Sequence, residues 1–68
     1  MYMENRVKAV RVATGMSQKE LAATVGVTRQ TLSLIEKGAY NPTLKLAIGI
    51  AKALDTTLDA LFWIEGWI

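Results

Sequence analysis

The chain has 68 residues, a formal net charge of +2 at neutral pH, 51% hydrophobic residues, and neither cysteine nor histidine. This length fits one domain whose core alone must stabilise the fold, because no disulfide and no thiolate or imidazole metal site can form. No segment reaches the roughly 18 consecutive apolar residues of a membrane span, and the N-terminus lacks the apolar stretch of a secretory signal. We therefore expect a cytoplasmic protein without a metal or a cofactor.

Two helices are predicted in the first part of the chain. The first runs from about residue 3 to residue 14 and is closed by Gly15. Ser17 and Glu20 then have the spacing of a capping box, in which each side chain accepts from the other residue's backbone N–H. A short second helix therefore begins around Gln18. The apolar face of the first helix consists of Met3, Val7, Val10 and Thr14.

A sharp reversal is predicted at Gly26, which tolerates a positive φ, and Thr28 caps the helix that follows. This third helix ends at Gly38 and turns Leu32 and Ile35 toward the core. The spacing of apolar and small residues is typical of two short helices that meet at an angle across a three- or four-residue turn. These residues are Leu21, Ala22, Val25, Gly26, Val27, Leu32 and Ile35.

Two further helices complete the predicted fold. Thr43 caps a strongly apolar fourth helix, which we expect at the centre of the core. Gly49 within it costs about 1 kcal/mol relative to alanine, unless another helix approaches closely there. Thr56 or Thr57 starts a short fifth helix. The inward positions are Ala47, Ile50, Ala51, Leu54, Leu58, Leu61 and Phe62, with Leu44 and Ile48 beside them.

The pattern as a whole predicts a single all-α domain over residues 1–68, with a core of five helices over residues 4–62 and an apolar tail over residues 63–68. The tail offers more apolar surface than a free chain end leaves in water. Two interpretations stay open: the tail joins two copies in a dimer, or it folds back over its own core. The apolar side chains of the tail are Trp63, Ile64, Trp67 and Ile68.

Charge is unevenly distributed along the chain. Through Lys45 there are seven basic and three acidic residues, whereas the remainder has one basic and three acidic residues. A basic first part and an acidic last part suit a polyanion bound on one side only. Composition taken alone favours ordinary solvated charge. No phosphate loop, nucleophile elbow or metal cluster is present, so we expect no enzymatic activity.

The stretch from Gln18 to Lys37 resembles the helix-turn-helix of the phage-repressor and Xre type, a family of small DNA-binding regulators. The framework residues match, with Ala22 small enough for the helices to approach and Gly26 at the turn. The resemblance extends over about residues 4–62. It implies a compact five-helix domain of the lambda-repressor type, with the helix-turn-helix at the second and third helices.

The resemblance also implies how the chain contacts double-stranded DNA. In such domains the third helix enters the major groove and the second crosses the backbone. Arg29 has the geometry to bind guanine and Gln30 to bind adenine, while Leu34 either contacts a thymine methyl or packs locally. The implied base-reading residues are Thr28, Arg29, Gln30, Ser33 and Leu34. The implied phosphate contacts are Gln18 and, more weakly, Thr31, Lys37, Tyr40, Asn41 and Thr43.

In members of this family a buried ion pair ties the first helix to the third, and Arg11 and Glu36 correspond to it. We expect a transcriptional regulator, most simply a repressor that binds a palindromic operator as a homodimer. One alternative keeps the fold and makes the chain the antitoxin of a toxin–antitoxin pair, with the tail binding a protein partner. Another is a protein-interaction or membrane-surface module that uses the tail.

Overall fold

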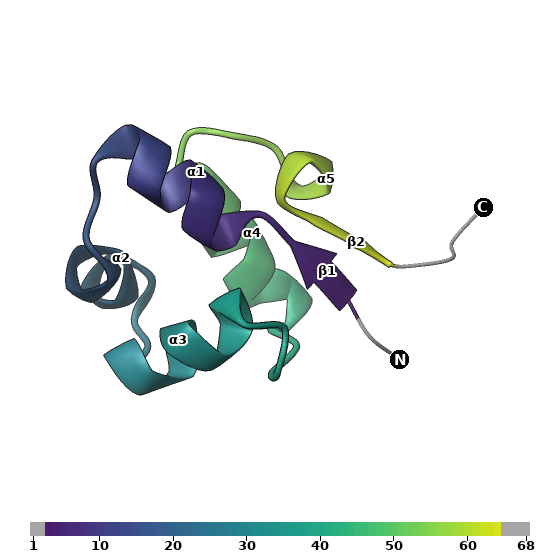
Figure 1. Ribbon diagram of the computed structural model, residues 1–68, viewed down its shortest axis with the longest axis horizontal. Helices are drawn as coiled ribbons and strands as arrows, with labels where there is room; N and C mark the ends of the chain where they lie inside the picture. The colour runs from purple at the N-terminus through teal and green to yellow at the C-terminus, as the bar shows by residue number, and fades with distance from the viewer. Residues whose placement is uncertain (1–2, 65–68) are drawn as a thin grey trace.

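The computed structural model describes the backbone of residues 3–64 and the side chains of residues 5–62. Five helices and two short strands follow one another along this part of the chain, and the strands lie beside each other at the end of the molecule opposite α2 (Figure 1). In chain order the elements are β1 (Met3–Asn5), α1 (Val7–Thr14), α2 (Gln18–Val25), α3 (Arg29–Glu36), α4 (Leu44–Ala53), α5 (Leu58–Leu61) and β2 (Phe62–Ile64).

The core forms around α4, as the sequence predicts. Ile50, Ala51 and Leu54 from this helix and its C-cap are buried against side chains from every other helix. Leu44 and Ile48 depart from the prediction, since 66% and 39% of their surfaces are exposed. They lie on the side of α4 that no other element covers within the described residues. The remaining members of the buried cluster are Val7, Leu21, Ala22, Leu32, Ile35 and Leu61.

The predicted helix boundaries at α2, α3 and α4 are confirmed by their caps. Thr28 and Thr43 each accept a hydrogen bond from a backbone N–H in the first turn, at 3.0 and 3.1 Å. Ser17 Oγ accepts from Glu20 N at 3.0 Å, and Glu20 Oε1 accepts from Ser17 N at 2.9 Å. Each cap satisfies donors that the first helical turn leaves without a partner.

The capping box at α2 makes a small part of the stability depend on pH. Hydrogen bonds from the backbone and the hydroxyl of Ser17 lower the pKa of Glu20 below its ordinary value of 4.5. Because the folded form has the lower pKa, this contribution is present above pH 4.5 and is lost as the pH falls through the folded pKa. We expect thermal unfolding of wild type and Glu20→Gln to converge as the pH falls through the lowered folded-state pKa of Glu20. A constant difference from pH 7 to pH 3 would contradict this.

The first helix begins later than predicted. The helical spacing of Met3 and Val7 suggests a start near residue 3, but α1 begins at Val7 and residues 3–5 form β1. Asn5 marks the transition, because its Oδ1 accepts from Val7 N at 3.1 Å and its Nδ2 donates to the Ile35 carbonyl at 2.8 Å. The side chain thereby satisfies a donor at the start of α1 and fixes this point to the end of α3.

The sheet has no counterpart in the predicted fold. β1 and β2 pair antiparallel, with Met3 opposite Ile64 and Asn5 opposite Phe62. The predicted boundary between core and tail therefore falls within β2, which includes the backbone of Trp63 and Ile64. The side chains of these two residues, and Trp67 and Ile68 entirely, lie outside the described part of the chain.

Neither close packing nor backbone conformation requires a glycine at position 49. A Cβ placed there would meet no atom within 4 Å, and no positive φ is required. We expect Gly49→Ala to raise the free energy of unfolding by about 1 kcal/mol, which corresponds to a rise of about 4–8 °C in Tm for a domain of this size. Gly15→Ala is the matched control, since a φ of 80° strains alanine and should lower Tm. A lower Tm for Gly49→Ala would refute the expectation.

Candidate nucleic-acid interface

The helix pair α2–α3 is held by a turn of three residues. Gly26 adopts a φ of 78°, which a side chain with a Cβ would disfavour, and the chain reverses there. Val27 N then donates to the Ala22 carbonyl at 3.0 Å, so the turn stays bonded to α2 while Thr28 begins α3. Ala22 is only 3% exposed, consistent with a small residue where the two helices approach.

An open depression lies on the outer surface of this helix pair. Its volume is about 420 Å³. The lining residues come from the start of α2 and from successive turns of α3, so the turn between the helices places them on one surface. They are Gln18, Arg29, Gln30, Ser33, Leu34 and Lys37. All six are residues to which the family resemblance assigns DNA contacts.

The other predicted contact residues do not line the depression. Thr28 and Thr31 lie at the start of α3, where Thr28 Oγ1 donates to Thr31 Oγ1 at 2.9 Å. Tyr40, Asn41 and Thr43 follow α3 in the loop before α4, and all three are exposed.

Leu34, which does line the depression, is 41% exposed, so its side chain remains available at the surface.

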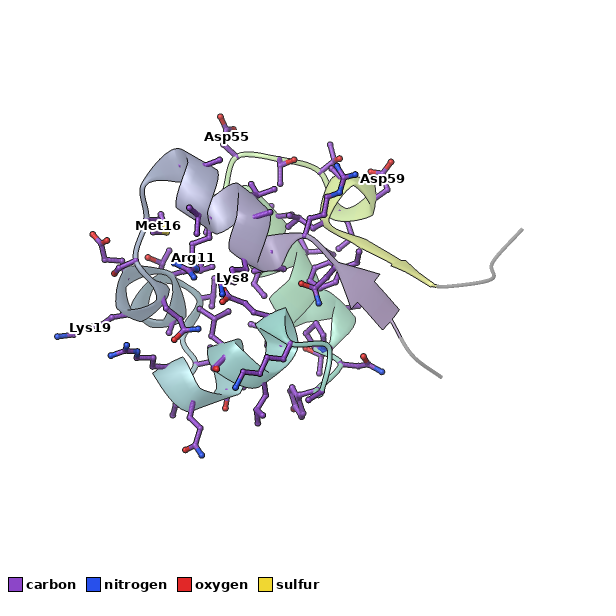
Figure 2. All side chains as sticks on the ribbon, viewed as in Figure 1. Lys8, Arg11, Met16, Lys19, Asp55 and Asp59 are labelled. Carbon is purple, nitrogen blue, oxygen red and sulfur yellow. The ribbon has the colours of Figure 1, made fainter. Side chains whose placement is uncertain are left out.

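Two basic residues at the depression and two acidic residues around α5 lie on different sides of the molecule. Arg29 and Lys37 are exposed on and just after α3. Asp55, in the loop before α5, and Asp59, on α5, lie on the side away from α3 in the view of Figure 2. A polyanion that approaches the depression therefore meets basic side chains first and stays distant from these carboxylates.

Beneath the depression, Arg11 and Glu36 form a salt bridge that joins α1 to the end of α3. Arg11 Nε lies 2.7 Å from Glu36 Oε2, and Arg11 Nη2 donates to Oε1 at 3.3 Å. Arg11 Nη1 also donates to the Met16 carbonyl at 3.0 Å; both residues are labelled in Figure 2. The side chains are 11% and 3% exposed, so the pair is largely removed from water.

Gln18 connects this salt bridge to the surface. Its Nε2 donates to Glu36 Oε1 at 3.1 Å, and its Oε1 accepts from Arg29 Nε at 3.3 Å. The family resemblance implies a role at phosphates for Gln18, and the sequence pattern gives no sign of these contacts. Residues 18 and 36 are brought together only by the angle between α2 and α3, which a linear pattern does not specify.

Comparison with known proteins places this geometry in a family. A family model described as helix-turn-helix matches residues 7–61, which include all five helices. The chain belongs to the helix-turn-helix family. A relative from Bacillus subtilis, the uncharacterized HTH-type transcriptional regulator YgzD, is 51% identical over 63 residues, which cover 93% of this chain and 96% of the relative.

Solved structures of regulatory proteins resemble about four fifths of the chain. The restriction-modification controller protein C.AhdI from Aeromonas hydrophila is 33% identical, with a TM-score of 0.76 over 81% of this chain and 83% of its own. SinR, the master regulator for biofilm formation, was solved in complex with DNA. It is also 33% identical, with a TM-score of 0.73 over 79% of this chain and 87% of its own.

Family membership confirms the resemblance to phage-repressor-type regulators and the five-helix fold that it implies. It also confirms that the chain is not an enzyme, because the family consists of regulators. Across the described residues, no helix is both long and apolar enough to cross a lipid bilayer. The individual DNA contacts and the dimer stay predictions.

Proposed function

We propose that this chain is a transcriptional repressor that binds double-stranded DNA in the cytoplasm and occupies a palindromic operator as a homodimer. The observation that carries the proposal is the depression on α2 and α3, where six side chains suited to DNA contact share one exposed surface. Family membership supports the DNA-binding part of the proposal.

Base reading is assigned to the first turns of α3, because the N-terminal residues of a recognition helix contact base edges in the major groove. Arg29 offers a planar fork of donors for guanine O6 and N7, and Gln30 offers both a donor and an acceptor to adenine. Thr28, Ser33 and Leu34 complete this set. Gln18, Thr31 and Lys37, together with the loop residues Tyr40, Asn41 and Thr43, contact phosphates, which fix the position of the helix without reading sequence.

Selection of bound duplexes from a pool with 20 randomised base pairs tests the function. We expect a consensus with two inverted half-sites about one helical turn apart, because one recognition helix reads only a few base pairs. Binding should weaken steeply with salt, as expected when cations replace counterions at phosphates. A pool that shows no enrichment would refute sequence-specific binding. An enriched single half-site would retain DNA reading and refute the symmetric dimer.

The dimer contact is assigned to the apolar tail, with Trp63, Ile64, Trp67 and Ile68 as its apolar side chains. Because β2 extends through Ile64, truncation after residue 64 retains the strand pairing, whereas truncation after residue 62 would disrupt it. We expect the chain ending at residue 64 to sediment as a monomer at concentrations where the full chain is a dimer. The matched control is Leu44→Ser, which changes a side chain that is 66% exposed on α4. A truncated chain that remains dimeric would exclude residues 65–68 from the contact.

A further inference from the structure

We propose that Glu36 is a positioning residue for sequence reading: it orients the Gln18 amide so that the amide oxygen holds the guanidinium of Arg29. This inference rests on the proposed function, because a role in sequence reading requires that the chain reads DNA. Glu36 does not line the depression. Glu36 acts through Gln18 and does not itself contact DNA.

A carboxylate that is already paired with an arginine determines which end of a neighbouring amide can bond to it. Ionised Glu36 has acceptors and no donor, and both of its oxygens lie close to donors of Arg11. Only the NH₂ end of the Gln18 amide can therefore bond to Glu36, as its Nε2 does at 3.1 Å. The flipped amide would place its oxygen against a carboxylate and its NH₂ against a guanidinium. Because of Glu36, the Gln18 amide can form both of its hydrogen bonds in one orientation only.

That orientation determines what Arg29 meets. The Gln18 oxygen faces outward and accepts from Arg29 Nε at 3.3 Å. A guanidinium carries five N–H donors, and this bond uses the single one on Nε. Both Nη groups remain available, and they are sufficient for the two hydrogen bonds to guanine O6 and N7. Gln18 therefore limits the rotation of the Arg29 side chain before DNA arrives without using the Nη donors.

The inner end of this chain of hydrogen bonds is fixed. Glu36 is held by two Arg11 donors, and Arg11 is held in turn by the Met16 carbonyl at 3.0 Å. Only 3% of the Glu36 side chain is exposed, so it has little freedom to turn toward water. Arg29 is thus connected through Gln18 to a buried ion pair whose partners are held by several hydrogen bonds. Preorganisation of this kind lowers the ordering cost of binding.

Gln18→Met gives the sharpest test, because it removes both hydrogen bonds of the amide and leaves the Arg11–Glu36 pair unchanged. Wild type and variants are compared by sequencing the duplexes that each retains from the same randomised pool. Arg29→Ala identifies the base pair that Arg29 reads, with an expected loss of about 5- to 150-fold in preference there. We expect Gln18→Met to lower the preference at that same base pair by about 3- to 10-fold, a part of the Arg29 effect.

Gln30→Ala is the matched control, since Gln30 lines the same depression but its loss should relax a different base pair. Glu36→Gln should resemble Gln18→Met, because an amide at position 36 accepts either orientation of Gln18. A folded Glu36→Gln variant that keeps the wild-type preference at the Arg29 base pair overturns the role of Glu36. Where Glu36→Gln does not fold, as judged by thermal unfolding, the double variant Arg11→Met with Glu36→Leu takes its place, because it removes the Glu36 carboxylate without leaving a buried charge unpaired.

The outcomes separate this inference from the function on which it rests. If Gln18→Met weakens all sequences equally and leaves every preference intact, Gln18 acts at a phosphate only and the inference is overturned. It is also overturned if Arg29→Ala relaxes no base pair while wild type still selects a consensus. If wild type selects no consensus at all, the proposed function fails and the positioning role fails with it.

Discussion

Replacing Glu36 with alanine should lower the free energy of unfolding by about 3–5 kcal/mol, more than any surface change in this domain. The cause is the charge that remains: Arg11 is 11% exposed and would lose both carboxylate bonds while its guanidinium stays ionised. An exposed ion pair contributes only about 0–1 kcal/mol, so the decrease in the free energy of unfolding distinguishes a buried pair from an exposed one. Urea unfolding monitored by circular dichroism gives the value directly.

The control for this prediction removes both charges together. In Arg11→Met with Glu36→Leu no ion is left without a partner, and apolar side chains of similar size often replace a buried pair with little loss. We expect the double variant to recover most of the stability that Glu36→Ala loses. If Glu36→Ala and the wild type unfold at the same urea concentration, the pair contributes no more than a solvated surface pair.

Replacing Arg29 with alanine should remove about 1–3 kcal/mol of discrimination at a single base pair of the selected operator. Lys37→Ala should instead weaken binding to all sequences alike and reduce the slope of log affinity against log salt by about 1, because a phosphate contact carries no sequence information. Lys8 lies on α1 and does not line the depression, so Lys8→Ala should change neither quantity by a comparable amount.

Quantitative binding to the consensus duplex, its single base-pair variants and a scrambled duplex at three salt concentrations separates these outcomes. A loss of affinity in Arg29→Ala that is equal for all duplexes would reassign Arg29 to the phosphates. A loss of discrimination in Lys37→Ala would place that residue among the base readers instead.

The helices and their ends could be predicted because the signals for them are local. The bonds between Ser17 and Glu20, like those at Thr28 and Thr43, each span only three residues, so the sequence shows both partners together. The face of α4 toward the core follows from helical spacing in the same way. Its exposed side was predicted less well, because Leu44 is apolar and pattern alone does not show what other elements leave uncovered.

The sheet could not be predicted because its two strands are three residues long and lie at opposite ends of the chain. A strand of this length shows no alternation, and the spacing of Met3 and Val7 also fits a helix. The residues that line the depression could be named because the family resemblance fixes their places at the start of α2 and along α3. The bonds of Gln18 to Glu36 and Arg29 required the structure, since they depend on how two helices cross.

The pairing of β1 with β2 closes nearly the whole chain into a loop. Met3 and Ile64 are paired although they are separated by almost the full sequence, so this contact incurs the largest loop-closure entropy in the domain. The sheet is therefore expected to form late in folding, after local helix contacts have shortened the effective loop. It also couples the two ends: any extension, processing or modification near residues 3–5 bears directly on the strand from which the apolar tail departs. Under the proposed dimer contact through the tail, we expect a change at residues 3–5 to shift the monomer–dimer equilibrium while the depression on α2 and α3 keeps its shape.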